Sequence, residues 1–477
     1  LSGGTHQLTV NQRPLNATLA RQYDASTTAA GSTLSSFNAL QGGENLTMTG
    51  SGTASSANVA NGISLSNNGN LALADGSGGS AGLASNYSLN STVINITPRV
   101  LNSSGSKTYD ANTNAIASII TLSNLTGSET LAHSGTASTS SANAGSYTIN
   151  NLSGISISNG TGTASNYTLT GGTHSFTIAE RVISVNGTRL YDATSNAEAS
   201  DLSTHTNLVG SQTLVLSGTG IIASRDVGSN KTVSVGTLTL ADGSNGGLAA
   251  NYTLSGGTHQ LTVTQRPLNS LGSKSYDANT DALANAITLS NLAGGETLVH
   301  SGTASTSSAN AGSYTINNLA GIGISNGTGT ASNYTLTGGT HSFTVNKRVV
   351  SLSGGSRQYN GSATAIAADL PTINNLVGSE TLTLSGNGVV ENANVGDNKP
   401  LTNLSGLTLQ NGSNGGLAAN YTLSGGSSII SITPRILSLD GSRVYDGTTN
   451  SNSSDLTISN LVGSETVSLS GFGTVTS

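Results

Sequence analysis

The stretch that decides the fold is Ser442-Arg-Val-Tyr-Asp-Gly-Thr-Thr449, because its core returns throughout the chain. That core is a basic residue, any residue, Tyr and Asp, and the fifth of its six copies has Asn in place of Asp. Successive tyrosines lie 82 to 86 residues apart, and a period of that length is a whole small domain, far longer than one coil of a solenoid. The signature residues are Arg21, Tyr23 and Asp24; Lys107, Tyr109 and Asp110; Arg189, Tyr191 and Asp192; Lys274, Tyr276 and Asp277; Arg357, Tyr359 and Asn360; and Arg443, Tyr445 and Asp446.

A second phrase, Asn-Tyr followed by Ser or Thr and Leu, marks the later part of each period and begins at Asn86, Asn166, Asn251, Asn333 and Asn420. Short arginine-containing phrases separate one period from the next and leave almost no linker. Residues 1–10 duplicate residues 254–263, so we interpret residues 1–12 as the closing strand of a preceding repeat. The predicted repeats are 13–98, 99–180, 181–265, 266–347 and 348–434, with a partial sixth at 435–477.

Within the second repeat, apolar and small polar residues alternate at 146–149, 155–157, 167–169 and 175–178. This is the period of a strand with one buried face, and Gly- and Asn-rich turns separate the segments. The pattern predicts an all-β chain, a tandem array of small Ig-like β-sandwich domains of about 85 residues. The short connections predict restrained neighbours and an extended rod. A β-helix would show a finer period of about 20 to 30 residues, which the sequence lacks.

The composition excludes several classes of function. Only 8% of the residues are charged, the net charge is −6, and no basic run exists, whereas nucleic-acid binding needs clustered Lys or Arg. No apolar stretch approaches the roughly 20 residues that cross a bilayer. We expect no cofactor. Calcium is a weak alternative, because the loops 226–230 and 242–245 supply one carboxylate each and Ca²⁺ takes six to eight oxygens.

Charged residues recur at regular places. Six basic residues stand in the signature, and six arginines stand at the repeat boundaries (Arg13, Arg99, Arg181, Arg266, Arg348 and Arg435). A glutamate recurs at Glu44, Glu129, Glu296, Glu380 and Glu465, with Gln212 in the third repeat. We expect the signature cation to pair with this glutamate or to stack on the tyrosine ring. We expect the signature Asp to cap the following turn.

Two further interpretations concern the same signature. An intramolecular isopeptide bond from Lys107 or Lys274 is disfavoured, because four of the six repeats carry Arg, which cannot form that bond. The residue after the signature Asp is Ala in four repeats. Because Ala avoids positive φ, we expect an ordinary turn there.

The histidines offer no catalytic or metal site. His6, His174, His259 and His341 each follow Gly-Gly-Thr before a closing strand, and two repeats lack the residue. A zinc or catalytic site needs convergent partners, and no nucleophile elbow is set between a strand and a helix. We therefore expect surface or edge histidines and a chain that is not an enzyme.

Several motifs together carry a family resemblance. They are Thr-Pro-Arg-Ile-Leu (433–437), Gly-Ser-Glu-Thr (463–466), Ala-Asn-Tyr-Thr-Leu (419–423), Asn-Ala-Gly (143–145) and the stretch 442–449. The chain resembles the YDG-type repeat domains and is similar to the related MBG-type repeats, although only Tyr445-Asp446-Gly447 spells the motif in full. Such repeats occur in tandem in large secreted bacterial surface proteins of the filamentous-haemagglutinin, two-partner-secretion kind. The resemblance implies an extracellular, bacterial cell-surface location and no catalytic residues.

These observations predict a structural, non-catalytic segment of an extracellular bacterial surface fibre or adhesin stalk. A charge-poor surface favours association, so the expected partners are other copies of the chain or neighbouring fibre chains in a filament or biofilm matrix. The alternative is that each repeat binds surface glycans or host proteins directly. The 13 tyrosines are candidate platforms for that purpose, but most recur at strand positions where burial explains them.

Overall fold

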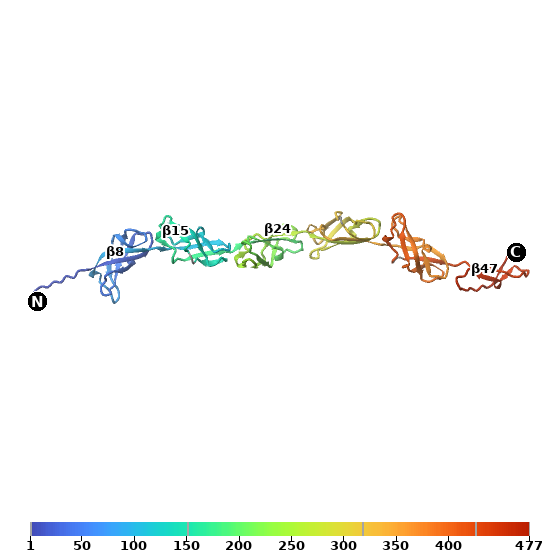
Figure 1. Cartoon of the computed structure of the whole chain (residues 1–477), viewed down its shortest axis with the longest axis horizontal. Coiled ribbons are helices and arrows are strands. Elements are labelled where there is room, and N and C mark those ends of the chain that lie inside the picture. Colours follow the sequence, from blue (N-terminus) through green and yellow to red (C-terminus); the bar gives the residue numbers. More distant parts are fainter. Residues whose placement is uncertain (1, 150–151, 317–318, 425–426, 477) are drawn as a thin grey trace. The chain divides into compact units, whose positions relative to one another are not determined.

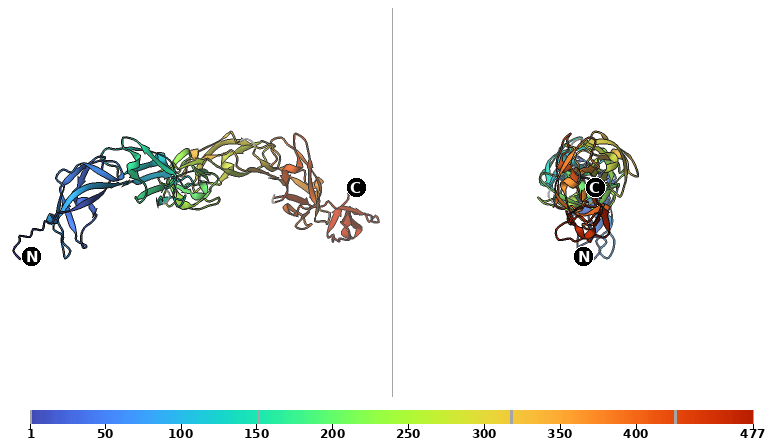
Figure 2. Two further views of the ribbon diagram at one scale, coloured as in Figure 1. Left: turned by 60° about the vertical axis from the view of Figure 1, so that its left-hand side comes forward. Right: turned by 90° about the vertical axis from the view of Figure 1, so that its right-hand side faces the viewer.

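The computed structural model describes residues 2–149, 152–316, 319–424 and 427–476. Within these residues every regular element is a β-strand or a three-residue 3₁₀ helix. Figure 1 shows each repeat as a small β-structure of its own, and Figure 2 shows that its strands curl. The prediction of an all-β chain of tandem repeated domains is confirmed. No helix of the described residues is long and apolar enough to cross a membrane.

The first repeat shows the strand order. Its main sheet runs β2-β5-β6-β8-β1-β3, and a second sheet pairs β4 with β7. The first strand lies parallel to the last, with Arg13 opposite Tyr87 and Gln22 opposite Thr97, and the other pairs are antiparallel. The strands are β1 (Arg13–Gln22), β2 (Thr28–Ala30), β3 (Leu34–Phe37), β4 (Leu46–Thr49), β5 (Ser51–Ala54), β6 (Ala60–Asn67), β7 (Ala72–Asp75) and β8 (Tyr87–Thr97).

The second and fourth repeats share one arrangement. In the second, a four-stranded sheet β12-β10-β17-β14 is accompanied by a three-stranded sheet β11-β13-β15, and β10 again runs parallel to the last strand, β17. Its strands are β10 (Asn102–Thr108), β11 (Asn114–Ile116), β12 (Ile120–Ser123), β13 (Leu131–Ser138), β14 (Gly145–Thr148), β15 (Ile155–Asn159) and β17 (His174–Ala179). In the fourth they are β29 (Asn269–Ser275), β30 (Asp281–Leu283), β31 (Ile287–Ser290), β32 (Leu298–Ser305), β33 (Gly312–Thr315), β34 (Ile322–Asn326) and β36 (His341–Asn346).

The third repeat has the strand order of the first, the fifth keeps a parallel pairing of an early strand with its last strand, and the partial sixth forms two two-stranded sheets. The third contains β19 (Ser184–Leu190), β20 (Asn196–Glu198), β21 (Thr204–Thr206), β22 (Leu214–Ser217), β23 (Thr219–Ile222), β24 (Gly228–Ser234), β25 (Thr239–Asp242) and β27 (Gln260–Thr264). The fifth contains β38 (Ser351–Ser353), β39 (Gly355–Gln358), β40 (Thr364–Ile366), β41 (Thr372–Asn374), β42 (Leu382–Val390), β43 (Gly396–Asn403), β44 (Leu407–Asn411) and β46 (Ile429–Thr433). The partial sixth contains β47 (Ser438–Gly441), β48 (Asn450–Asn452), β49 (Leu456–Ser459) and β50 (Phe472–Thr474). Residues 2–12 form no strand, and the repeat division remains a prediction.

Short two-residue strands link successive repeats. Each begins at a boundary arginine and pairs in parallel with the Tyr-Thr of its own repeat's Asn-Tyr phrase, as β9 (Arg99–Val100) pairs with β16 (Tyr167–Thr168). The same pairing joins β18 (Arg181–Val182) to β26 (Tyr252–Thr253), β28 (Arg266–Pro267) to β35 (Tyr334–Thr335), and β37 (Arg348–Val349) to β45 (Tyr421–Thr422). A 3₁₀ turn such as Ala164–Asn166 precedes each tyrosine.

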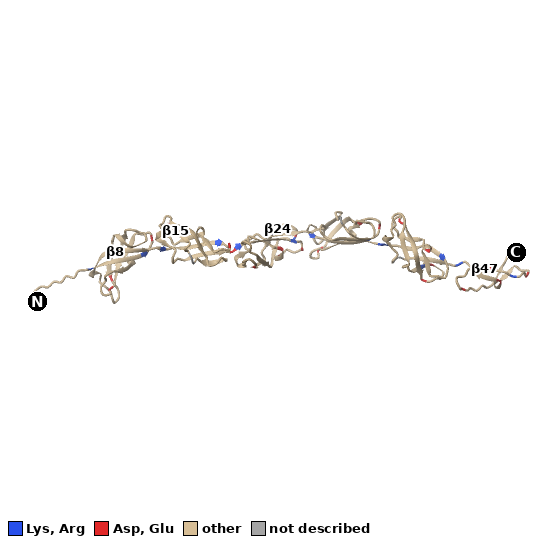
Figure 3. Cartoon of the chain, in the orientation of Figure 1, with Lys and Arg blue, Asp and Glu red and all other residues tan. Residues whose placement is uncertain are grey.

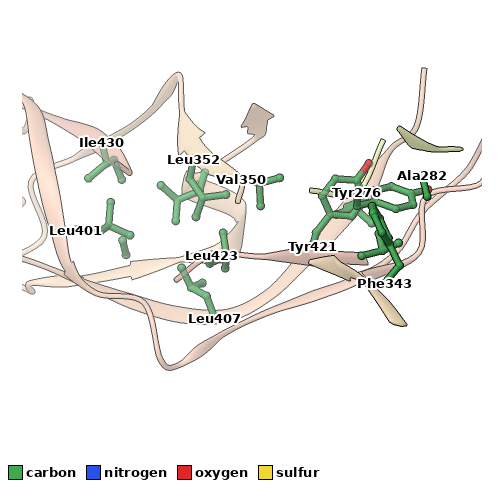
Figure 4. Close-up of a cluster of buried hydrophobic side chains, with 14 of the residues drawn as sticks. Tyr276, Ala282, Phe343, Val350, Leu352, Leu401, Leu407, Tyr421, Leu423 and Ile430 are labelled. Atoms are coloured by element: carbon green, nitrogen blue, oxygen red, sulfur yellow. The ribbon is translucent and has the colours of Figure 1, made fainter. Parts of the chain in front are cut away.

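The apolar cores do not stop at the repeat boundary. The described chain divides into two compact units: the first takes residues up to 188, 195–223 and 230–261, and the second takes 189–194, 224–229 and 262 onward. Within the first unit, one cluster joins Ala17, Leu19 and Tyr23 of repeat one to Leu101 and Tyr167 of repeat two. Within the second unit, Figure 4 shows Tyr421 of repeat five beside Tyr276 and Phe343 of repeat four. Charged residues are sparse over every repeat (Figure 3).

Candidate functional site

The recurring site of this protein is the contact between one repeat and the next. In the first repeat, Tyr23 follows β1 directly, and its backbone N–H donates to Thr97 O at the end of the last strand (2.9 Å). Two residues later Arg99 opens the second repeat, and it is paired with Tyr167. The parallel pairing of first and last strands therefore places Tyr23 against Tyr167 of the following repeat.

A single carboxylate joins the two tyrosines. Tyr23 Oη donates to Glu129 Oε1 (2.7 Å), and Tyr167 Oη donates to Glu129 Oε2 (2.5 Å). The backbone N–H of Thr126 donates to Tyr167 Oη (3.1 Å). The two rings meet edge to face, with centroids 5.3 Å apart and planes at 77°, which is a favoured geometry for aromatic pairs. We call the signature tyrosine, this glutamate and the Asn-Tyr of the next repeat the junction cluster.

The junction cluster recurs within the second unit. At each site one Glu accepts both hydroxyls, and the rings keep the same edge-to-face geometry, with centroids 5.3 to 5.4 Å apart. The sets are Tyr191 and Tyr334 on Glu296 (2.8 and 2.7 Å), and Tyr276 and Tyr421 on Glu380 (2.7 and 2.5 Å). Tyr359 donates to Glu465 of the partial sixth repeat.

The junction after the second repeat uses an amide in place of the carboxylate. Gln212 Oε1 accepts from Tyr252 Oη (2.5 Å), while Gln212 Nε2 donates to Tyr109 Oη (3.0 Å). The ring pair is unchanged, with centroids 5.3 Å apart and planes at 77°. Because the amide has one donor and one acceptor side, it satisfies both hydroxyls by reversing the sense of one bond. The tyrosine pair therefore keeps its geometry when the carboxylate is replaced by a neutral amide.

A buried asparagine closes the other side of each cluster. Asn166 Oδ1 accepts the Val59 backbone N–H (2.8 Å), and its Nδ2 donates to Asn58 Oδ1 (2.9 Å). Both partners belong to the preceding repeat, and Asn166 is fully buried. The same exchange is made by Asn251 with Ala144 and Asn143, by Asn333 with Val227 and Asp226, and by Asn420 with Ala311 and Asn310. A buried amide satisfied from a neighbouring domain fixes the register between the two.

The boundary arginine completes the junction. Arg99 Nε donates to Asn124 O (2.7 Å), its Nη2 donates to Asn124 Oδ1 (2.9 Å), and its Nη1 donates to Tyr23 O of the preceding repeat (3.5 Å). Arg181, Arg266 and Arg348 make the equivalent three bonds. The acceptor asparagine is held at positive φ, 68° for Asn124, a conformation that Asn tolerates better than most residues.

The electrostatics keep the junction tyrosines protonated. Burial, followed by the hydrogen bond to Glu129, raises the pKa of Tyr23 to about 12. Burial and the bonded glutamate likewise raise the pKa values of Tyr276, Tyr334 and Tyr421 to about 12. Ionising such a hydroxyl would place a second negative charge against the carboxylate, so the neutral phenol is the form the cluster needs.

Among the described residues the signature cation does not pair with the recurring glutamate, so that alternative is wrong, and stacking on the tyrosine ring stays a prediction. The cation pairs instead with the signature Asp three residues later, as Lys107 Nζ does with Asp110 Oδ1 (2.8 Å), and it also donates to a backbone carbonyl five residues on. The pairs are Arg21–Asp24, Arg189–Asp192, Lys274–Asp277 and Arg443–Asp446. The glutamate is already engaged by two tyrosines. Arg225, outside the signature, does reach Glu296 Oε1 (3.4 Å).

The signature Asp caps its turn, as expected. Asp24 Oδ1 accepts the Ser26 backbone N–H (2.9 Å), and Asp192 Oδ1 accepts that of Thr194 (2.9 Å). Burial alone would raise the pKa of Asp110, but the hydrogen bonds from Lys107 and Asn112 leave it below its usual value. The hydrogen bond from Arg443, followed by those from Thr448, lowers the pKa of Asp446 to about 2.

The turn after the signature is not an ordinary one, which corrects the expectation drawn from alanine. The residue that follows the Asp or Asn has positive φ in all six repeats: 62° at Ala25, 62° at Ala111, 67° at Ala193, 63° at Ala278, 69° at Gly361 and 79° at Gly447. The cation, the Asx turn and the parallel strands together hold this conformation against the preference of alanine.

The histidines before the closing strands are buried, not exposed, except for His6. His174 Nε2 contacts Leu169 O (2.8 Å), and Nδ1 contacts Ser103 Oγ (3.0 Å). His259 and His341 take the same place in their repeats. They link the closing strand to the loop before it. Among the described residues no group of three or more His, Asp or Glu is placed to hold a metal ion.

The sequence alone did not reveal the roles of the glutamate and the asparagine. The asparagine recurs in each of the five full repeats and the glutamate in all of them but the third, which was the available signal. Their partners, however, lie about a hundred residues away in the chain: 106 residues separate Tyr23 from Glu129, and 107 separate Val59 from Asn166. The recurrence of a residue indicates that each repeat requires it, but it does not identify the residue's partner.

Comparisons with known proteins find one repeated domain in this chain. A family model described as the YDG domain matches four segments, residues 7–94, 95–175, 179–260 and 346–428. The comparison with curated proteins gives no match. Among solved structures, the crystal structure of the N-terminal eight Ig domains of Down Syndrome Cell Adhesion Molecule isoform 1.30.30 is similar at 8% identity and a TM-score of 0.09. That alignment covers 80% of this chain and 60% of that one.

Proposed function

This chain belongs to the YDG domain family, and from that premise we propose that it is a structural, non-catalytic segment of an extracellular bacterial surface fibre or adhesin stalk. Its task is mechanical: tandem repeats hold whatever they carry away from the cell. Its partners are other copies of itself or neighbouring fibre chains, and no step of its work requires a cofactor.

The junction cluster is the observation that supports this proposal. It repeats with the same ring geometry from Tyr23–Glu129 to Tyr276–Glu380, and with the same hydrogen bonds except at Gln212, where one is reversed. Domains joined by flexible linkers move independently, whereas a buried, directional interface restrains them. A protein whose repeats each bind a ligand separately does not need the same rigid interface at every repeat boundary. A load-bearing segment does, because each restrained boundary adds to the stiffness of the whole.

The surface composition supports association between chains. Only 8% of the residues are charged and the net charge is −6, so neighbouring chains experience little repulsion. Hydroxyl and amide side chains on facing surfaces offer hydrogen bonds in either direction. Lateral cohesion of the repeats into a filament or matrix follows from this surface.

The proposal is tested by small-angle scattering on the whole chain and on a variant with four of the five junctions weakened, in which Tyr23, Tyr109, Tyr191 and Tyr276 are changed to Ala. We expect the native chain to scatter as a stiff object and the variant to scatter as a flexible chain of folded repeats. A native chain as flexible as the variant would contradict the proposal. Electron microscopy of the native material then separates an isolated stalk, one domain wide, from a thicker filament of many chains.

A further inference from the structure

The fifth repeat differs from the others at one position of its signature. Asn360 stands where the other five repeats have Asp, and glycine follows it. Arg357 still occupies the cation position, and its side chain is only 7% exposed. It forms a long ion pair with Asp369, whose Oδ2 lies 3.8 Å from Arg357 Nε. In the other repeats the cation pairs directly with the signature Asp.

We propose that Asn360 is a self-processing site, which deamidates through the Gly361 amide and leaves aspartate in the position where the other repeats encode it. The reaction is a covalent maturation of the fifth repeat. It gives Arg357 a carboxylate at the signature position, in addition to the encoded Asp369 at 3.8 Å.

The reaction balances with water as its one co-reactant. The backbone nitrogen of Gly361 attacks Cγ of Asn360, and the side-chain amide leaves as ammonia with the proton from Gly361 N. The five-membered succinimide then takes up one water, which breaks the bond between Gly361 N and Cγ and returns the proton to nitrogen. The net change is replacement of the side-chain amide by a carboxylate, with release of ammonia.

The geometry at Asn360 favours each step. Its Oδ1 accepts the Ser362 backbone N–H (3.0 Å), which folds the side chain back over the peptide bond to Gly361. Arg357 Nη1 also donates to Oδ1, so a guanidinium lies where negative charge develops as Cγ becomes tetrahedral. The same contact favours water attack at Cγ, the route that regenerates normal aspartate and not its β-linked isomer. Asn360 and Gly361 are both exposed, so water reaches them.

The attacking amide is also free at this site. Gly361 N–H makes no hydrogen bond among the described residues, and glycine places no side chain in the way of ring closure. The chain has nine other Asn-Gly pairs, and three of them provide the contrast, because the glycine N–H there donates to a carbonyl. These are Gly160 to Gly162 O (3.2 Å), Gly327 to Gly329 O (3.1 Å) and Gly412 to Gly416 O (3.0 Å). The preceding asparagines use their Oδ1 atoms to accept from Ala164, Ala331 and Ala418.

The test is peptide mass spectrometry on the full chain, sampled over time at neutral pH from freshly made protein. We expect conversion at Asn360 to run at least about tenfold ahead of Asn159, Asn326 and Asn411 in the same molecules, as suits an oriented group with an oxyanion donor. Chromatography against the Asn360→Asp variant identifies the product as normal aspartate. Conversion no faster than at the three comparison sites, or a product that is mainly the β-linked isomer, overturns the proposal.

Two variants separate the contributions. Gly361→Ala should abolish conversion over the same period, and alanine is already accepted at this turn position in four repeats. Its Cβ would lie 2.9 Å from Val462 Cγ1, so its fold is checked by circular dichroism. Arg357→Gln should slow conversion about tenfold or more, because it removes the donor to Oδ1. Unchanged rates in both folded variants would also overturn the proposal.

Discussion

Tyr23 and Tyr167, from two consecutive repeats, meet edge to face at 5.3 Å and donate their hydroxyls to the two oxygens of one glutamate. Each such contact therefore joins a repeat to its neighbour through residues of both. A repeat supplies its signature tyrosine to the next repeat and accepts the tyrosine of the preceding one with its own Tyr and its Glu, or Gln212 in the third repeat.

Removing one hydroxyl should weaken a junction measurably. Tyr191→Phe leaves the ring pair intact but takes one donor from Glu296, which is 8% exposed. We expect a loss of about 1–2 kcal/mol in the free energy of unfolding of the repeat pair, since a buried acceptor loses its partner. Denaturant unfolding of the full chain measures it. Tyr445→Phe is the matched control, because Tyr445 is 90% exposed, and an equal effect there would contradict the assignment.

The carboxylate should be replaceable by an amide but not by alanine. Gln212 already performs the role at one junction, so Glu380→Gln should cost less than about 1 kcal/mol, whereas Glu380→Ala should cost about 2–4 kcal/mol by leaving two hydroxyls unsatisfied. Thermal unfolding followed by tyrosine fluorescence compares the two. Similar losses from both variants would show that charge, and not hydrogen bonding, holds the junction.

The asparagine of the Asn-Tyr phrase should contribute to the free energy of unfolding only where it is hydrogen-bonded to the preceding repeat. Asn333→Ala leaves the Val227 N–H and the Asp226 carboxylate without the bonds that Asn333 provides. We expect a cost of about 1–3 kcal/mol, typical of buried polar groups deprived of a partner. Asn86, at the equivalent position of the first repeat, is exposed, and Asn86→Ala should be nearly silent in the same assay.

Alkaline pH should release the junctions. The pKa values of Tyr23, Tyr276, Tyr334 and Tyr421 are raised from 10 to about 12. Between these values the unfolded chain loses the protons that the folded chain keeps, so stability is full below pH 10 and falls as the pH rises towards 12. Tyrosinate absorbance should appear together with loss of β-sheet circular dichroism. Full ionisation of these tyrosines in a chain that keeps its native spectrum would contradict this.

Glycine should relieve the backbone strain at the turn that follows the signature. Ala278 has a φ of 63°, and Ala278→Gly should stabilise its repeat by about 0.5–1 kcal/mol, the left-handed penalty less the entropy of glycine. Gly447→Ala is the converse test: φ is 79° and a Cβ there meets nothing within 4 Å, so only backbone strain is added. Calorimetry should show the two shifts in opposite directions.

The sequence by itself determined the repeat period, the strand class and the residues that recur. These depend on local properties: side chains alternate along a strand whatever it pairs with, and a tandem copy repeats every residue it needs. The turn-capping Asp was also predictable, because its partner Ser26 lies two residues away.

Only the tertiary structure decided which recurring residues meet. Parallel pairing of the first and last strands brings Tyr23 to the end of its repeat. The pairing of Arg99 with Tyr167 then places Tyr167 of the next repeat beside it. Tyr23 and Glu129 are 106 residues apart, so no local pattern connects them. The same long-range constraint buried His174 and held Ala25 at positive φ. Each residue type has a preferred local conformation. Long-range contacts impose a different one wherever the free energy they contribute exceeds the cost of the local strain.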